Sequence, residues 1–180
     1  HREGLLAGPS IASFEEAILE ARRKGLSVES ILALDRADRL TREIFEAAIE
    51  FGHRLILSDG GDPGLSRNRG VAEARGQFVS FCDADDLWSA NWLSAAFTFC
   101  NKFPPNVVAH SEINLTFGTE SQIWAHADSE TSSFKEDYLR IGNYWDAMSF
   151  ASRQIYLDYP FRANNIALRQ GHEDWHWNCM

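Results

Sequence analysis

Apolar residues recur along the first 100 residues of the chain with two different periods. In some stretches they stand three or four positions apart, as on one face of an amphipathic helix, and between these lie short continuous apolar runs typical of buried strands. The helical spacing covers residues 14–24, 39–51, 67–74 and 92–99. The apolar runs cover residues 28–34, 54–57 and 77–82. Because helices and strands alternate over short connections, the pattern predicts an α/β fold with a mostly parallel sheet flanked by helices.

Local signals mark the ends of the first two helices. Ser13 and Glu16 form a capping box at the start of the first, and Gly25 supplies its stop. Asp38 is a suitable N-cap for the second helix, which Gly52 closes. Because the pattern opens on a helix, we expect a strand ahead of the first residue. We also expect flanking segments to be missing at both ends of the chain.

The pattern changes after Pro105. The later segments are two strand-like runs, a short helix and an aromatic-rich stretch, at residues 107–117, 122–125, 132–140 and 144–161. We therefore expect a small antiparallel, aromatic-rich region that elaborates the first half. Since no repeat or linker separates the two parts, we predict one domain over residues 1–180, with halves at 1–103 and 104–180.

The composition narrows the classes of function. The chain has 180 residues, with 17 Lys and Arg against 26 Asp and Glu, and its formal net charge is −9. This acidic balance argues against a nucleic-acid binder, which needs a basic face. No apolar run reaches the roughly 18 residues of a membrane-spanning helix. The three cysteines fit neither a disulfide framework nor a zinc site, which favours a reducing compartment.

An acidic cluster follows the third predicted strand. Asp83, Asp85 and Asp86 occupy three of four consecutive positions directly after an apolar run. Carboxylates at positions i and i+2 of a strand end can converge on a hard divalent cation such as Mg²⁺, which is usually shared with substrate phosphates. Asp35 also follows a predicted strand and falls on the same edge of the sheet, where ligands bind in such folds. The alternative is a polar turn that caps the next helix.

A second candidate is the segment 64–70, in which a glycine turn leads into a helix with two basic side chains, Arg67 and Arg69. A guanidinium group offers a planar fork to phosphate or carboxylate, and a helix start presents free N–H groups. The alternative is an exposed amphipathic helix that follows a loop.

The run GLSRNRGVAEARGQFVSFCDADDLWSANWL at residues 64–93 resembles the core of the inverting glycosyltransferases of family 2. Other parts of that family's pattern occur in the expected order. They are the loop after the first strand, the end of the second strand and a late Glu-Asp-Trp segment, at His1-Arg2-Glu3, Leu34-Asp35 and Gly171–Trp175. The resemblance implies the GT-A fold, a Rossmann-like arrangement. One departure is Asp35–Asp38, which replaces an acidic pair and Gly-Ser and leaves the nucleotide's identity open.

The resemblance also implies roles for particular residues. Those implied in binding the donor or the acceptor are Glu3, Asp35, Arg67, Asn68, Asp83 and Trp175. Asp85, together with Asp83, would ligate Mg²⁺ or Mn²⁺. Asp174 would be the general base that deprotonates the acceptor hydroxyl, and Glu173 would support it.

The implied activity is metal-dependent, inverting transfer of a sugar from a UDP- or GDP-sugar to a glycan, a lipid-linked acceptor or a small molecule. We expect it in the cytoplasm, at the inner membrane surface if the acceptor is a lipid. Two alternatives stay open. One is a remnant that binds a nucleotide sugar without turning it over. The other is a zinc metallohydrolase, because His172-Glu173-Asp174-Trp175-His176 satisfies the H-E-x-x-H spacing.

Overall fold

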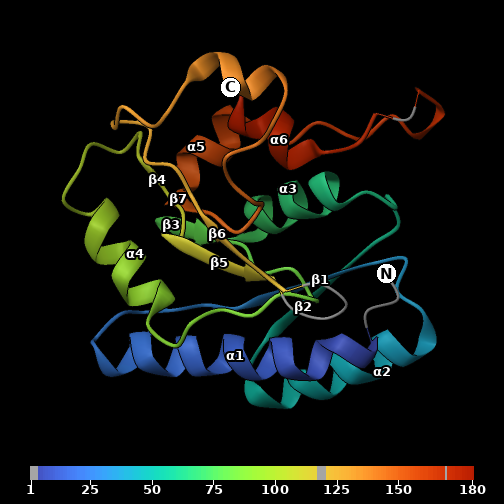
Figure 1. Cartoon of the computed structure of the whole chain (residues 1–180). Helices are drawn as coiled ribbons and strands as arrows, with labels where there is room; N and C mark the ends of the chain where they lie inside the picture. Colours follow the sequence, from blue (N-terminus) through green and yellow to red (C-terminus); the bar gives the residue numbers. More distant parts are fainter. Residues whose placement is uncertain (1–3, 117–120, 169) are drawn as a thin grey trace.

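The computed structural model describes residues 4–116, 121–168 and 170–180. Its first half is layered, with two helices side by side along one face of a strand pair and a third helix against the opposite face (Figure 1). The two helices are α1 (Gly4–Arg23) and α2 (Arg39–Ala48), and the strand pair is β1 (Ile31–Asp35) with β2 (Arg54–Ser58). The third helix is α3 (Pro63–Glu73). The predicted alternation of helices and strands therefore builds an α/β fold.

Strands β1 and β2 pair in parallel, in register from Ile31 opposite Arg54 to Asp35 opposite Ser58. In β1 the side chains alternate between buried and more exposed positions, as a strand's period of two requires. Both strands end at the same edge, so Asp35 stands where the sequence places it.

Strand β3 (Phe78–Ser80) differs from the third parallel strand that we predict. It pairs antiparallel with β7 (Phe150–Ser152), which also pairs antiparallel with β4 (Val108–Ala109). The new partner comes from the aromatic-rich stretch, where Phe150 is buried and stacks on Phe78 with ring centroids 5.3 Å apart. Within the described residues, β1 and β2 are thus the parallel pair and the other strands run antiparallel.

Helix α1 begins at Gly4 and not at residue 14. The predicted capping box is interior to the helix, because the Ser13 hydroxyl donates back to the Ser10 carbonyl at 2.9 Å and accepts from the Trp88 backbone N–H at 3.2 Å. The predicted stop is confirmed, since Gly25 follows the helix at φ 84°. Asp38 likewise caps α2 by accepting from the Thr41 N–H at 2.9 Å.

The second half covers one end of this frame. Beyond α4 (Trp92–Cys100), which belongs to the first half, its further elements are a hairpin of two antiparallel strands and four short helical segments. These are β5 (Ile113–Thr116) with β6 (Gln122–Ala125), η2 (Glu136–Arg140), α5 (Arg153–Asp158), η3 (Ile166–Leu168) and α6 (Glu173–Asn178). The expected antiparallel region is therefore present, and the helix expected at 132–140 is the short 3₁₀ helix η2. In the part of the chain described, no helix combines the length and hydrophobicity needed to cross a membrane.

An aromatic cluster fixes α6 against the rest of the fold. Trp177 stacks on Tyr156 and Phe161, with ring centroids 5.1 and 5.3 Å apart, and all three side chains are buried. The Trp177 indole N–H donates to the Tyr159 carbonyl at 2.7 Å. Since α6 is only six residues long, this packing rather than helix propensity holds it in place.

Candidate functional site

The acidic cluster forms a turn between β3 and α4. The Asp86 N–H donates to the Asp83 carbonyl at 3.0 Å, and the buried Trp88 donates its indole N–H to the Phe81 carbonyl at 3.2 Å. The anchored turn leaves Asp85 exposed to solvent. Burial, together with the carboxylates of Asp83 and Asp85, raises the pKa of Asp86 to about 6. The turn therefore carries negative charge, which the Arg67 guanidinium only partly offsets.

Arg67 of α3 joins this turn to α6. Its buried guanidinium donates to both carboxylate oxygens of Asp83, at 2.9 and 2.7 Å, and to Glu173 Oε1 at 2.6 Å. The Arg67 side chain is 8% exposed and that of Glu173 10%. Two residues that stand 106 positions apart in sequence are thus locked in one charged bridge. Gly64 allows the close approach, because a Cβ there would lie 3.1 Å from Glu173 Cγ.

Charge and burial oppose each other in this bridge. Burial lowers the pKa of Arg67, but the Asp83 and Glu173 carboxylates outweigh it and the net shift is upward. Burial raises the pKa of Glu173, but hydrogen bonds from Asn164 and Arg67 outweigh it and the net shift is downward. Arg67 and Glu173 therefore stay ionised at neutral pH, and the bridge depends on keeping its partners.

Asp35 ends β1 beside the same region. Burial raises its pKa, but hydrogen bonds from the Gly61 and Asp62 backbone and from nearby serines outweigh it, so the pKa lies below its usual range. Oδ2 accepts from the Asp62 N–H at 2.8 Å. Oδ1 is buried and has no hydrogen-bond partner among the described residues. A buried acceptor without a partner is costly, which makes this oxygen a candidate ligand contact.

A cavity of about 1030 Å³ brings several of these residues together. Asp35, Arg67, Asp83 and Asp85 are among the residues that line it, together with residues of α1, β1 and β3. Its volume lies at the upper end of the range for small-molecule and cofactor sites, roughly 300–1,000 Å³. Arg69 instead lines a separate cavity of about 450 Å³ beside the end of β2.

Two other predicted residues have structural partners. Asn68 donates to the Phe161 carbonyl at 2.8 Å and accepts from the Phe161 N–H at 2.9 Å, so its amide ties α3 to the segment before α6. Trp175 donates its indole N–H to the Leu139 carbonyl at 2.7 Å. Glu3 lies outside the described residues.

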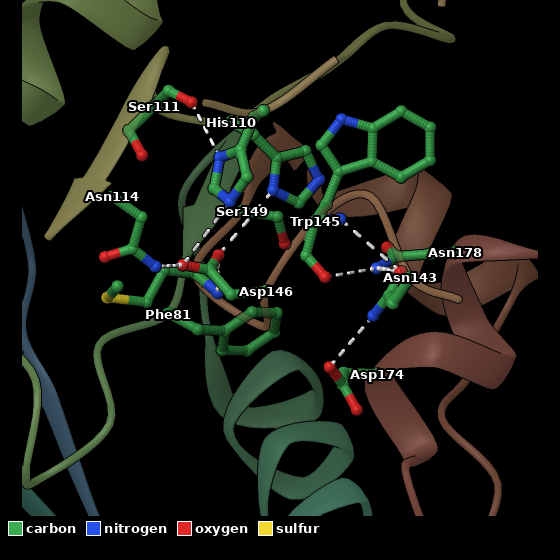
Figure 2. Close-up of polar contacts among 12 residues, drawn as sticks. Phe81, His110, Ser111, Asn114, Asn143, Trp145, Asp146, Ser149, Asp174 and Asn178 are labelled. Atoms are coloured by element: carbon green, nitrogen blue, oxygen red, sulfur yellow. Dashed lines mark hydrogen bonds and ion pairs between the residues drawn. The ribbon is translucent and has the colours of Figure 1, made fainter. Parts of the chain in front are cut away.

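Asp174, the predicted base, is half-buried near the start of α6. Its Oδ2 accepts a hydrogen bond from Asn143 Nδ2 at 3.2 Å (Figure 2). Asn143 itself was missed by the sequence analysis, because an amide within an aromatic-rich loop carries no local signal. The contact joins residues 31 positions apart and depends on how α6 packs.

The histidine pair of the H-E-x-x-H pattern lies on one turn, with the His176 N–H donating to the His172 carbonyl at 3.0 Å. Among the described residues, no group of three or more His, Cys, Asp or Glu side chains is arranged to hold a metal ion. The pair therefore has no third described ligand of the kind that zinc sites use.

Comparison with known proteins identifies the family. The sequence matches the model of Glycosyl transferase family 2 over residues 9–159. The chain belongs to this family. Its fold is accordingly the α/β GT-A fold that the resemblance implies. Members of this family often use divalent metals.

A solved structure supports the fold. The crystal structure of S. aureus TarS 1-349 matches with a TM-score of 0.61 and 18% sequence identity, covering 96% of this chain. The glycosyltransferase chain spans 50% of that protein. No curated protein matches the sequence. At this identity the likeness concerns the fold alone.

Proposed function

We propose that this glycosyltransferase moves a sugar from a nucleoside-diphosphate sugar to an acceptor hydroxyl with inversion at the anomeric carbon. One observation carries the proposal: Arg67 binds Asp83 of the cavity lining and Glu173 of α6 at the same time. The bridge links α6 to two residues of the cavity lining, and Asp174 is the next residue along α6 after Glu173. A binding end and a candidate base are thereby fixed relative to each other.

The donor end uses carboxylates of two kinds. Both carboxylate oxygens of Asp83 accept hydrogen bonds from Arg67. The Asp85 carboxylate is exposed, and carboxylate oxygens are ligands that suit a hard cation. We therefore assign Asp85 to Mg²⁺ or Mn²⁺, with Asp83 as its neighbour in the turn. When bound, the cation would neutralise charge on the departing diphosphate. The unpartnered Oδ1 of Asp35 is the contact that we assign to the nucleoside, of which UDP and GDP are the leading candidates.

The acceptor end depends on Asp174. In the proposed reaction the acceptor hydroxyl oxygen forms a bond to the anomeric carbon while the bond from that carbon to the diphosphate oxygen breaks. The bonding electrons leave with the diphosphate, and the hydroxyl proton passes to the Asp174 carboxylate. Glu173 stays ionised against Arg67 and holds the start of α6. The acceptor is a glycan, a lipid-linked molecule or a small molecule, met on the cytoplasmic side.

Calorimetric titration with UDP-, GDP- and dTDP-sugars tests the donor site. We expect one nucleotide class to bind with Mn²⁺, and either EDTA or Asp85→Ala to weaken this binding at least about tenfold, which is 1.4 kcal/mol. Asp137→Ala is the matched control, because that carboxylate is 90% exposed on η2 and lies outside the cavity lining. Equal binding in EDTA and by Asp85→Ala would contradict the metal assignment, and binding of none of the three classes would contradict the proposed function.

A further inference from the structure

A loop residue outside α6 donates a hydrogen bond to the Asp174 carboxylate. Asn143, which follows η2, donates from Nδ2 to Asp174 Oδ2 at 3.2 Å (Figure 2). Among the described residues, the other carboxylate oxygen of Asp174 has no hydrogen-bond partner. A carboxylate held by one oxygen keeps the second available to accept a proton.

The surrounding contacts fix which end of the Asn143 amide faces Asp174. Asn143 Oδ1 accepts from Asn178 Nδ2 at 3.1 Å and from the Trp145 backbone N–H at 3.4 Å. Both donors require the oxygen on that side, so the NH₂ group points at the carboxylate. The reversed amide would place its oxygen against Asp174 and lose all three hydrogen bonds.

The loop that carries Asn143 is itself anchored. The Trp145 indole N–H donates to the Ala127 carbonyl at 2.8 Å, and its ring stacks on His110 and Phe134 with centroids 5.7 Å away in each case. Asn178 also donates to the Trp145 carbonyl at 3.3 Å, so the last turn of α6 is tied to the same loop. The amide that meets Asp174 is therefore held from both sides.

We propose that Asn143 is the positioning residue for Asp174, and that Asn178 orients Asn143. The amide fixes one oxygen of the carboxylate and thereby sets the direction from which the other takes the acceptor's proton. Removing a residue that orients a metal ligand through a hydrogen bond typically lowers activity about 10–100-fold, and we expect a loss of the same size here. The proposal rests on the proposed function, because it needs Asp174 to be the base.

Asn143→Asp tests the hydrogen bond with the least change in shape. The new carboxylate keeps the oxygen that accepts from Asn178 and Trp145, loses the donor to Asp174, and sets a second negative charge beside it. We expect kcat for nucleoside-diphosphate release to fall about 10–100-fold, with the donor's KM unchanged. Asn143→Ala, which adds no charge, should lower kcat in the same direction. Gln154→Ala is the control, since it removes another amide–carboxylate pair, to Asp158 at 2.7 Å, between two exposed side chains of α5.

A double-mutant cycle separates positioning from a structural role. In an Asp174→Asn background, Asn143→Asp should have no further effect on kcat, whereas a merely structural role would lower kcat again. If Asp174→Asn lowers kcat while Asn143→Asp and Asn143→Ala both keep the wild-type kcat, the positioning role is overturned. If Asp174→Asn itself keeps the wild-type kcat, the assignment of the base fails instead, and the positioning role fails with it.

Discussion

Asp174→Asn is expected to lower kcat about 10²–10⁴-fold, the usual contribution of a positioned general base. The amide has nearly the same shape as the carboxylate but cannot accept the acceptor's proton. Because Asp85, and not Asp174, lines the cavity that we propose for the donor, the affinity for the nucleotide sugar should stay unchanged. The measurement is steady-state release of nucleoside diphosphate, with donor affinity determined separately by calorimetry.

The control for this variant is a carboxylate on the neighbouring helix. Asp158→Asn on α5 alters an exposed side chain whose described partner is Gln154, and it should leave kcat within about twofold. A wild-type kcat in Asp174→Asn would contradict the role of base. An equal loss of donor affinity and kcat would instead place Asp174 in donor binding.

Arg67→Met is expected to destabilise the fold by about 3–5 kcal/mol, the cost of removing one partner from a buried ion pair. The Glu173 carboxylate, 10% exposed, would keep its charge but lose the guanidinium that offsets its burial. Asp83 would lose both of its hydrogen bonds from Arg67 as well. Urea-induced unfolding followed by circular dichroism measures the change.

Arg39→Met provides the matched comparison for the arginine. Arg39 is 90% exposed and pairs with Glu43 at 2.8 Å within α2, so its loss should change stability by no more than about 0.5 kcal/mol. A similar small effect for Arg67→Met would show that the bridge does not hold the turn and α6 together. The link between α6, which carries Asp174, and the lining of the proposed donor cavity would then lose its structural basis.

Much of the frame follows from local sequence signals. The apolar runs and their polar ends place β1, β2 and the acidic turn, and Asp38 caps α2 as predicted. The predicted start of α3 is wrong, because the helix begins at Pro63 and not at residue 67. Asp62 caps this helix by accepting from the Leu65 N–H at 2.9 Å, with Pro63 at the first helical position. Asp-Pro is a readable signal for such a start.

The remaining differences are non-local. Ser13 has the sequence of a cap, but its hydroxyl is used inside α1 because the turn before α4 packs against it. Strand β3 takes β7 as its partner through residues that lie about 70 positions away, and no local pattern encodes that choice. The bridge through Arg67 and the contact of Asn143 with Asp174 arise in the same way, from the packing of α6. The sequence thus predicts the helices and strands better than it predicts the contacts between them.

The most direct test of the central claim is the anomeric form of the sugar that the enzyme releases. With an α-linked nucleotide sugar of the class found by titration, Mn²⁺ and water as the acceptor, ¹H NMR follows the product before it mutarotates. Inverting transfer with Asp174 as the base predicts that the β-anomer appears first and that Asp174→Asn forms almost none. Initial release of the α-anomer would contradict the inverting displacement, and donor binding without any release of sugar would identify a nucleotide-sugar-binding protein instead.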